Sequence, residues 1–397
     1  MPLSFRSANV ELYCLECRAR YRPEPLLYKC RRCGSLLEAK VEPVEPVVFS
    51  GKGVWRYSSL LPTPMAGSEP VTLLEGQTPL IKAKRIAPRV EAYIKLEGSN
   101  PTGSFKDRGM AVAVTLGKAW GFWSAIAAST GNTAASAAAY TARAGMKCLV
   151  LLPRGKVAPG KLFQALLHGA IVAEIEESFD EAVRVAERAA WELRLYPLNS
   201  FNPWRLEGQK TIAYELFEQL GEEPDAVVVP VGNGGNIFAI WKGFAELKDL
   251  GLISNVPRMI GVQAEGASPL VKAWREGSDP VVEEPSTIAT AIRIGRPVNY
   301  KRVLRAVRES RGALVSVADS MILEAQKALA AEEGIGVEPA SAAPLAAYEM
   351  LVNEGVIDRG EKVVFVATGH ALKDPSVPLH YRIHRVASIR DLARLLE

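Results

Sequence analysis

Four of the five cysteines lie within the first 33 residues, in an arrangement typical of a metal site. Cys14 and Cys17 form one C-x2-C pair, and Cys30 and Cys33 form another after twelve intervening residues. Each pair folds its two thiolates around one point, and two pairs complete the tetrahedral sulfur site that suits zinc, or iron in its place. We therefore expect a structural metal. Two disulfides are the alternative, which the lack of a recognisable secretion signal disfavours.

A single lysine, Lys106, lies in the stretch EGSNPTGSFKDRGMA, among residues that normally form a turn. Ser104 and Asp107 have the spacing of a capping box, which predicts that Lys106 lies in the first turn of a helix. There the positive end of the helix dipole disfavours the charged ammonium. A neutral lysine amine is the usual nucleophile for a Schiff base with an aldehyde such as that of pyridoxal phosphate. For Lys106 taken alone, a surface lysine beside a turn is the alternative.

A turn after the apolar segment SAIAAS could bind an anion. Thr130, Gly131, Asn132 and Thr133 precede an alanine-rich helix, whose free N–H groups could bind a carboxylate or a phosphate. The hydroxyls of Ser129, Thr130 and Thr133 would add further donors. The alternative is that Asn132 or Thr133 only caps the helix.

A second turn, after DAVVVPV, is rich in glycine. Gly232, Asn233, Gly234, Gly235 and Asn236 precede another predicted helix, and such a loop can surround an oxyanion with backbone N–H groups. The loop matches neither the Walker A motif nor the dinucleotide fingerprint, which indicates a monophosphate ligand. A plain tight turn is the alternative.

A third turn follows KVVFVA. Thr368 ends this strand, and its hydroxyl would point towards a ligand, whereas His370 is more simply a structural hydrogen-bonding residue. Together the three turns and Lys106 could hold an aldehyde-bearing monophosphate cofactor and a substrate anion.

The elements that must position these turns alternate along the chain. Strands are predicted at AYIKLE, SAIAAS, KCLVLLP, DAVVVPV, RMIGVQA and KVVFVAT. Helices are predicted over residues 105–116, 134–144, 161–168, 180–193, 208–219, 321–331 and 341–353, and at IFAIWKGF. This alternation predicts mostly parallel sheets, and ligands bind at the carboxyl ends of such strands. We expect a four-cysteine ribbon over 1–40, a large α/β domain over 41–100 and 200–397, and a small α/β domain over 101–199.

The composition is that of an ordinary globular protein. Of the 397 residues 48% are hydrophobic, the net charge is +4, and no segment approaches the roughly 20 apolar residues of a membrane span. We expect a cytoplasmic protein that binds no membrane and no nucleic acid. An alternative makes the ribbon a nucleic-acid-binding module, through Arg18, Arg20, Arg22, Lys29, Arg31 and Arg32 with Tyr13, Tyr21 and Tyr28.

Seven segments, in order, resemble the threonine synthase family: SNPTGSFKDRGM, STGNTAASAAAY, NPWRLEGQKT, GNGGN, TIATAIRIGRPVNY, EPASAA and TGHALKD. The resemblance runs from about Gly76 to Pro375 and is to the short bacterial and archaeal type. Some archaeal members carry a similar ribbon. Ala371 departs from the glycine usual in the family. The resemblance implies the fold-type II, tryptophan synthase β-like architecture of pyridoxal-phosphate enzymes, with two open, mostly parallel α/β domains.

The resemblance also implies roles for individual residues. Lys106 would form the Schiff base with pyridoxal phosphate, Asn132 would bind the phenolic oxygen, and Thr368 would meet the pyridine nitrogen. The cofactor phosphate would be held by Gly232, Asn233, Gly234, Gly235 and Asn236. The substrate would be bound by Ser129, Thr130, Thr133, Asn199 and Arg205. Without the family, Arg205 is more simply a surface ion pair with Glu207.

The activity implied is the conversion of O-phospho-L-homoserine and water to L-threonine and phosphate, in a homodimer. Three rivals differ in chemistry or class: a serine or threonine dehydratase, which has no use for a phosphate pocket; a cysteate synthase acting on phosphoserine, which would keep one; and a catalytically silent relative.

Overall fold

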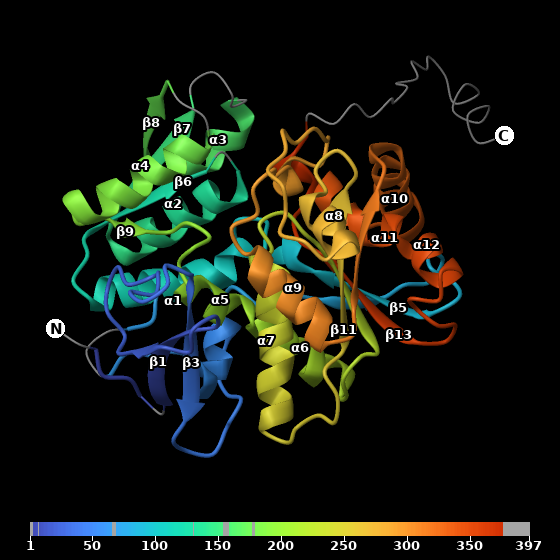
Figure 1. Cartoon of the computed structure of the whole chain (residues 1–397), viewed down its shortest axis with the longest axis horizontal. Coiled ribbons are helices and arrows are strands. Elements are labelled where there is room, and N and C mark those ends of the chain that lie inside the picture. Colours follow the sequence, from blue (N-terminus) through green and yellow to red (C-terminus); the bar gives the residue numbers. More distant parts are fainter. Residues whose placement is uncertain are drawn as a thin grey trace, which may run out of the picture.

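The protein is described by a computed structural model, which covers residues 3–375 except 7, 66–68, 130, 154–158 and 177–178. Three sheets organise the chain: a small antiparallel sheet near the N-terminus and two larger α/β layers (Figure 1). Within these residues no helix combines the length and apolar character needed to cross a membrane.

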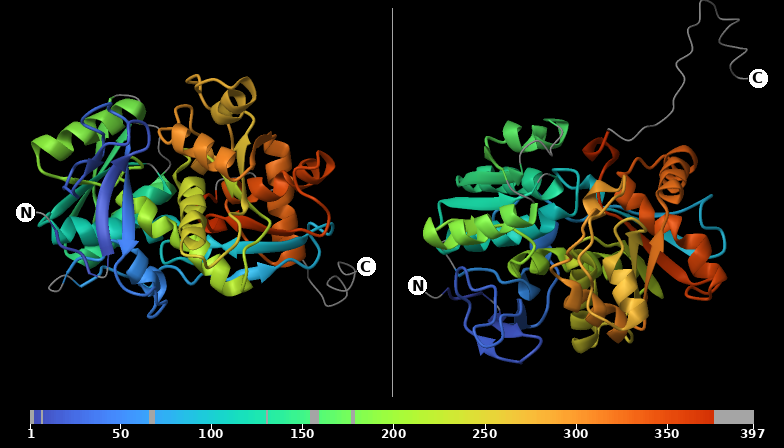
Figure 2. Two further views of the ribbon diagram at one scale, coloured as in Figure 1. Left: turned by 60° about the horizontal axis from the view of Figure 1, so that its bottom comes forward. Right: turned by 45° about the horizontal axis from the view of Figure 1, so that its top comes forward.

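The N-terminal ribbon is a three-stranded antiparallel sheet in the order β2-β1-β3. Its strands are β1 (Ala8–Cys14), β2 (Arg20–Tyr21) and β3 (Leu37–Pro43). Because β3 pairs with β1 as far as Pro43, the first residues of the segment VEPVEPVV belong to the sheet. Leu12 and Leu37 are fully buried, although the ribbon is small. The ribbon lies beside both α/β layers (Figure 2), and this contact supplies the core that it could not build alone.

The four-stranded sheet is parallel throughout, in the order β8-β7-β6-β9. Its strands are β6 (Ser124–Ala128), β7 (Lys147–Pro153), β8 (Ile171–Ile175) and β9 (Tyr196–Pro197). The helices of this part are α1 (Lys106–Ala119), α2 (Asn132–Ala144), α3 (Pro159–Leu167) and α4 (Phe179–Glu192). Cys148 is buried in β7, as predicted.

The six-stranded sheet has the order β12-β11-β10-β13-β5-β4 and is parallel except for β4. Its strands are β4 (Leu80–Lys82), β5 (Glu91–Leu96), β10 (Ala226–Pro230), β11 (Arg258–Ala264), β12 (Ala313–Val317) and β13 (Lys362–Ala367). Its helices are α5 (Trp204–Gln209), α6 (Thr211–Leu220), α7 (Gly235–Asp249), α8 (Pro269–Glu276), α9 (Tyr300–Glu309), α10 (Asp319–Glu333), α11 (Pro339–Ala346) and α12 (Tyr348–Asn353). Short 3-10 helices are η1 (Gly53–Leu60), η2 (Glu97–Ser99), η3 (Thr290–Ile292) and η4 (Ala371–Lys373).

All six predicted strands are present. The predicted helices over 208–219 and 341–353 are each divided in two, at Lys210 and at Ala347. In the two larger sheets and their helices, the elements that were not predicted are β4, β8, β9, β12, α8 and α9. Strand β8 lies at the edge of its sheet and has no fully buried residue, so it lacks the continuous apolar run of a central strand. The predicted domain limits stay a prediction.

Helices α1 and α5 cross with their backbones in contact. A Cβ atom added at Gly208 would lie 1.9 Å from the carbonyl oxygen of Arg108, and one added at Gly109 would lie 2.6 Å from that of Arg205. Only glycine fits at these two positions, because the backbones of the two helices approach so closely. The crossing places the first turn of α1, with Lys106, beside the first turn of α5, with Arg205.

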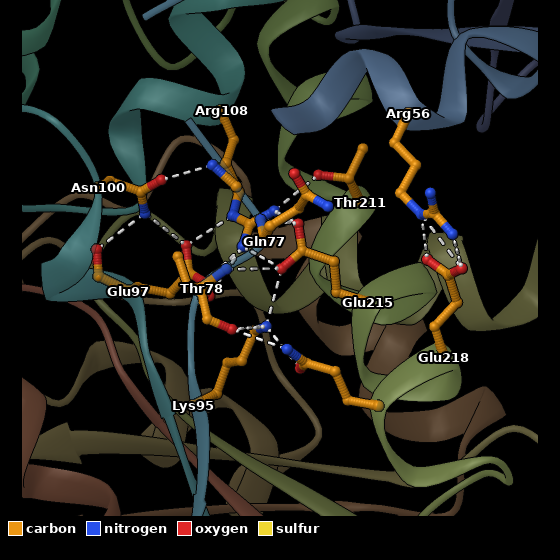
Figure 3. Close-up of polar contacts among 12 residues, drawn as sticks. Arg56, Gln77, Thr78, Lys95, Glu97, Asn100, Arg108, Thr211, Glu215 and Glu218 are labelled. Carbon is orange, nitrogen blue, oxygen red and sulfur yellow. Dashed lines mark hydrogen bonds and ion pairs between the residues drawn. The ribbon is translucent and has the colours of Figure 1, made fainter. Parts of the chain in front are cut away.

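A buried charge network fixes α1 to the large sheet (Figure 3). Arg108 is fully buried and forms ion pairs of 2.6 Å with both Glu97 and Glu215. Lys95 Nζ lies 2.8 Å from Glu215 Oε2 and also donates to the carbonyl oxygen of Thr78. Because each of these four charged groups is paired with another, their desolvation is offset within the protein.

We expect Arg108→Met to lower the free energy of unfolding by about 3–5 kcal/mol, because two buried carboxylates would lose their main partner. Arg56→Met is the matched control, since the Arg56 and Glu218 side chains are 29% and 26% exposed in their ion pair. An exposed pair contributes at most about 1 kcal/mol. Urea titration of both variants measures the difference, and equal losses would contradict the assignment.

Candidate active site

One cavity of about 1500 Å³ contains the predicted chemistry. It is lined by every described residue that was predicted to bind a cofactor or substrate: Lys106, Ser129, Asn132, Thr133, Asn199, Arg205, Gly232, Asn233, Gly234, Gly235, Asn236 and Thr368. Thr130 lies outside the described residues. Residues far apart in the sequence thus meet at the carboxyl ends of β6, β10 and β13.

Lys106 is the first residue of α1, and backbone contacts fix this end of the helix. The Phe105 N–H donates to the carbonyl oxygen of Thr368 over 3.1 Å, which joins the start of α1 to the end of β13. The predicted capping box is wrong, because the Asp107 carboxylate accepts from Thr102 and from Ser136 instead. The N–H of Asp107 donates to the backbone carbonyl of Ser104 rather than to its hydroxyl. A local pattern was overridden here by a tertiary contact with α2.

The amine of Lys106 is held in a form suited to attack a carbonyl. Burial and the nearby positive charge of Arg205 lower the pKa of Lys106 to about 7, against a partial opposing effect of Glu338. Its Nζ atom lies 4.1 Å from the centroid of the Phe105 ring. A large fraction of the Lys106 amine is therefore neutral at physiological pH, as predicted. The cause is burial and a neighbouring charge rather than the helix dipole.

The glycine-rich loop lies at the N-terminus of α7, where backbone N–H groups are available to an anion. Gly234 has a φ of +82°, and a Cβ atom there would lie 2.1 Å from Val303, so the loop can carry no side chain at this position. Asn236 is 6% exposed, and within the described part of the chain neither its Nδ2 nor its Oδ1 has a hydrogen-bond partner. Both polar atoms of this buried amide are therefore available to a ligand or an ordered water.

The turn after β6 does not match the alternative in which Asn132 or Thr133 only caps the helix. Helix α2 begins at Asn132 with Gly131 before it, and no side chain caps it. Asn132 Nδ2 instead donates to the Glu338 carboxylate, at 3.0 and 3.2 Å. Asn199 holds the end of β6, since its amide exchanges hydrogen bonds with the backbone of Ala128. Ser129 Oγ accepts from the N–H of Gly131.

Arg205 is a buried cation facing the cavity. It is 3% exposed, its Nε has no partner among the described residues, and burial lowers its pKa to about 10. The alternative of a surface pair with Glu207 is wrong, because the Glu207 carboxylate pairs with Lys210 and Lys242. A buried guanidinium that remains charged at neutral pH is set up to bind an anionic ligand.

Two residues of the site were missed by sequence reasoning. Glu338 is 3% exposed, accepts hydrogen bonds from Asn132 and opposes the lowering of the Lys106 pKa, and burial raises its own pKa to about 7. Ser341 Oγ lies 3.0 Å from Thr368 Oγ1 and accepts from the N–H of Gly369. Both belong to the segment EPASAA, which carried the family resemblance, but only the structure shows that they fix Asn132 and Thr368.

The four N-terminal cysteines converge on one point. Their sulfur atoms all lie within 4.8 Å of one another, and all four thiols are free, so the two disulfides are not formed. Tyr21 Oη lies 3.1 Å from Cys30 Sγ. Tyr28 packs on Phe201 with ring centroids 5.6 Å apart, which places it in the core and away from any stacking nucleobase. The cluster has the ligand set of a closed tetrahedral metal site.

Comparison with known proteins agrees with this geometry. Residues 71–369 match the family model "Pyridoxal-phosphate dependent enzyme". The chain is 50% identical to threonine synthase of Methanosarcina acetivorans, over 92% of each chain, and 49% identical to that of Methanocaldococcus jannaschii, over 92% of this chain and 93% of the relative. The chain belongs to the threonine synthase family of pyridoxal-phosphate-dependent enzymes.

Membership of this family confirms the predicted enzyme class, a pyridoxal-phosphate-dependent lyase. Solved structures agree on the fold: maize serine racemase aligns with a TM-score of 0.65 at 20% identity, over 81% of this chain and 92% of the other. Threonine deaminase isoform 2 from Solanum lycopersicum aligns with a TM-score of 0.64 at 24% identity, over 80% of this chain and 82% of the other. The predicted fold class is confirmed as well.

The cavity fits the family's cofactor. The glycine-rich loop and Asn236, whose amide has no partner among the described residues, suit a phosphate group, and Lys106 with its lowered pKa suits an aldehyde. The hydroxyl of Thr368, held by Ser341, suits a ring nitrogen.

Proposed function

We propose that this protein converts O-phospho-L-homoserine and water to L-threonine and phosphate. One observation supports this substrate most directly: the buried Arg205, whose Nε has no partner among the described residues, lines the same cavity as Lys106. A substrate with both an amino group and a phosphate would use both Lys106 and Arg205. Threonine synthases are also relatives whose similarity covers most of the chain.

In this proposal the cofactor is held by residues that already converge. Lys106 binds its aldehyde, Asn132 its phenolic oxygen, Thr368 its pyridine nitrogen, and the loop from Gly232 to Asn236 its phosphate. When bound, pyridoxal phosphate supplies an electron sink that stabilises negative charge at the carbons of the substrate amino acid. The neutral hydroxyl of Thr368 tempers this property, because it protonates the ring nitrogen less than a carboxylic acid would.

The residues around the substrate have separate tasks. The turn from Ser129 to Thr133 binds the substrate carboxylate with backbone and hydroxyl donors. Arg205 pairs with the substrate phosphate and stabilises it as it leaves, with Thr133 and the remaining amide hydrogen of Asn199 as further donors. The amine of Lys106, once free, moves protons at the α and β carbons. Closure of the small domain would exclude water until the phosphate has left.

We further propose that the four cysteines bind one structural zinc ion, and that the protein is a homodimer in the cytoplasm. The closed sulfur set of Cys14, Cys17, Cys30 and Cys33 supports the metal. Metal analysis of protein purified without added metal is expected to give one zinc per chain. Iron in its place, or no metal, would contradict this part.

The pH dependence of cofactor capture tests the role of Lys106. We expect the rate at which cofactor-free protein binds pyridoxal phosphate to rise with pH and level off above about 7, since only the neutral amine attacks the aldehyde. Arg205→Met removes a positive charge that lowers this pKa, so its midpoint should lie at higher pH. Stopped-flow absorbance measures both profiles, and a midpoint near the ordinary lysine value in the wild type would refute the assignment.

The reaction itself is tested by product analysis. Purified protein is given O-phosphohomoserine, with phosphoserine plus sulfite in parallel, and phosphate and amino acids are quantified. Threonine and phosphate in equal amounts from the first substrate are the expected result. Cysteate from the second, without threonine, would replace the proposed substrate while leaving the cofactor site intact. No product in either case, with cofactor bound, would refute the proposed activity.

A further inference from the structure

Asn299 lies beside the glycine-rich loop with an unused donor. The residue precedes α9, is 1% exposed and lines the cavity, and its Nδ2 has no hydrogen-bond partner among the described residues. A Cβ atom added at Gly235 would lie 3.6 Å from that nitrogen. The backbone N–H of Asn299 also bonds to the carbonyl oxygen of Asn233, so the residue is fixed against the loop.

The orientation of the Asn299 amide is set by Arg302, one turn along α9. Arg302 Nη1 donates to Asn299 Oδ1. Because a guanidinium has no acceptor, the amide oxygen must face Arg302. The amide nitrogen must then face the glycine-rich loop, where a phosphate would find a further donor.

Arg302 is in turn held by the N-terminal ribbon. It is 3% exposed, its Nη2 donates to the carbonyl oxygen of Leu37 over 2.6 Å, and its Nε pairs with the fully buried Glu38. Both partners lie on β3, a few residues after Cys33. One continuous set of contacts therefore runs from the ribbon through Arg302 and Asn299 to the loop.

We propose that Asn299 is a further ligand of the cofactor phosphate, and that the ribbon holds it in place through Arg302. This inference rests on the proposed cofactor site. Arg302 is a positioning residue, since it acts through Asn299. The ribbon is thereby given a task beyond anchoring the N-terminus: Leu37 and Glu38 orient a donor in the active-site cavity.

The test compares two probes that differ only in the phosphate. Dissociation constants of pyridoxal phosphate and of pyridoxal are measured for the cofactor-free protein by fluorescence titration. Asn299→Asp keeps the bond to Arg302 but turns a negative oxygen towards the loop. We expect this variant to weaken the binding of pyridoxal phosphate at least tenfold and the binding of pyridoxal less than twofold. Asn299→Ser, a smaller change, should weaken only pyridoxal phosphate, by severalfold.

Variants of Arg302 on α9 and of Glu38 on the ribbon test whether the ribbon supports Asn299. Arg302→Met and Glu38→Ala should each weaken the binding of pyridoxal phosphate severalfold. Glu38→Gln keeps an acceptor for Arg302, so it should retain most of the wild-type affinity. Lys301→Ala is the matched control, because Lys301 joins α9 to the ribbon residue Glu16 in a pair whose side chains are 47% and 40% exposed. It should leave both affinities unchanged.

Equal weakening of both probes would show a merely structural role and overturn the proposal, as would unchanged affinity in both Asn299 variants. Normal affinity in Arg302→Met and Glu38→Ala would overturn the support by the ribbon. These readouts need no substrate, so they are independent of the proposed activity. If the wild-type protein makes threonine but Asn299→Asp binds pyridoxal phosphate with normal affinity, the inference about Asn299 is refuted and the proposed function stands.

Discussion

Lys106→Ala is expected to lower kcat for O-phosphohomoserine by about 10⁴-fold or more, because in the proposed mechanism one amine would both bind the cofactor aldehyde and move the protons. The lysine lines the cavity, and its pKa of about 7 lets it exchange protons at neutral pH. The absorbance of the lysine-bound cofactor should be lost as well. Steady-state phosphate release and absorbance spectra measure the two effects.

Lys118→Ala is the matched control, since Lys118 is exposed in the last turn of the same helix. It should retain full activity and the normal spectrum. A small primary amine added to Lys106→Ala should restore part of the rate, because it can take over the proton transfers. Activity in Lys106→Ala within a factor of ten of wild type would remove the lysine from the mechanism.

Arg205→Met is expected to lower kcat/KM by roughly 10²–10³-fold, which is the usual effect of removing one donor from a developing anion. The same change should raise the melting temperature of the substrate-free protein, because it removes a buried charge whose Nε has no partner among the described residues. Activity and stability would thus move in opposite directions. Phosphate-release kinetics and thermal melting of the same samples measure both.

Arg108→Met separates this effect from a general loss of buried arginine, since Arg108 is paired and its removal should destabilise the fold. Arg205→Lys should recover part of kcat/KM by keeping the charge. If Arg205→Met melted at a lower temperature and kept its kcat/KM, the guanidinium would be structural and the substrate would need no phosphate.

The chemistry-bearing turns could be predicted from the sequence because each lies where an apolar strand ends. Strands such as SAIAAS and DAVVVPV are continuous apolar runs, and parallel sheets collect their carboxyl ends at one edge. Every described residue predicted for the site accordingly lines one cavity. The cysteine spacing likewise predicted that four sulfur atoms converge on one point, because each C-x2-C pair turns its two thiols together.

The missed residues depend on contacts between distant segments. Nothing near Glu338 in the sequence shows that its carboxylate meets Asn132, 206 residues earlier. The same holds for Arg302 and Glu38, which are 264 positions apart. The expected capping box failed for a related reason, since Asp107 finds Ser136 on another helix. Local patterns predict which elements form, whereas side-chain partners are chosen by the packing of the whole chain.

The contact between Gly109 and Gly208 has one more consequence. Since the two helix backbones touch there, the separation between the main chain of Lys106 and the main chain of Arg205 is fixed by the helix crossing. In the proposed mechanism the substrate must reach both side chains, so this separation would limit the length of its carbon chain. A side chain at Gly109 or Gly208 would push the two helices apart, and we expect it to change which substrate length is accepted.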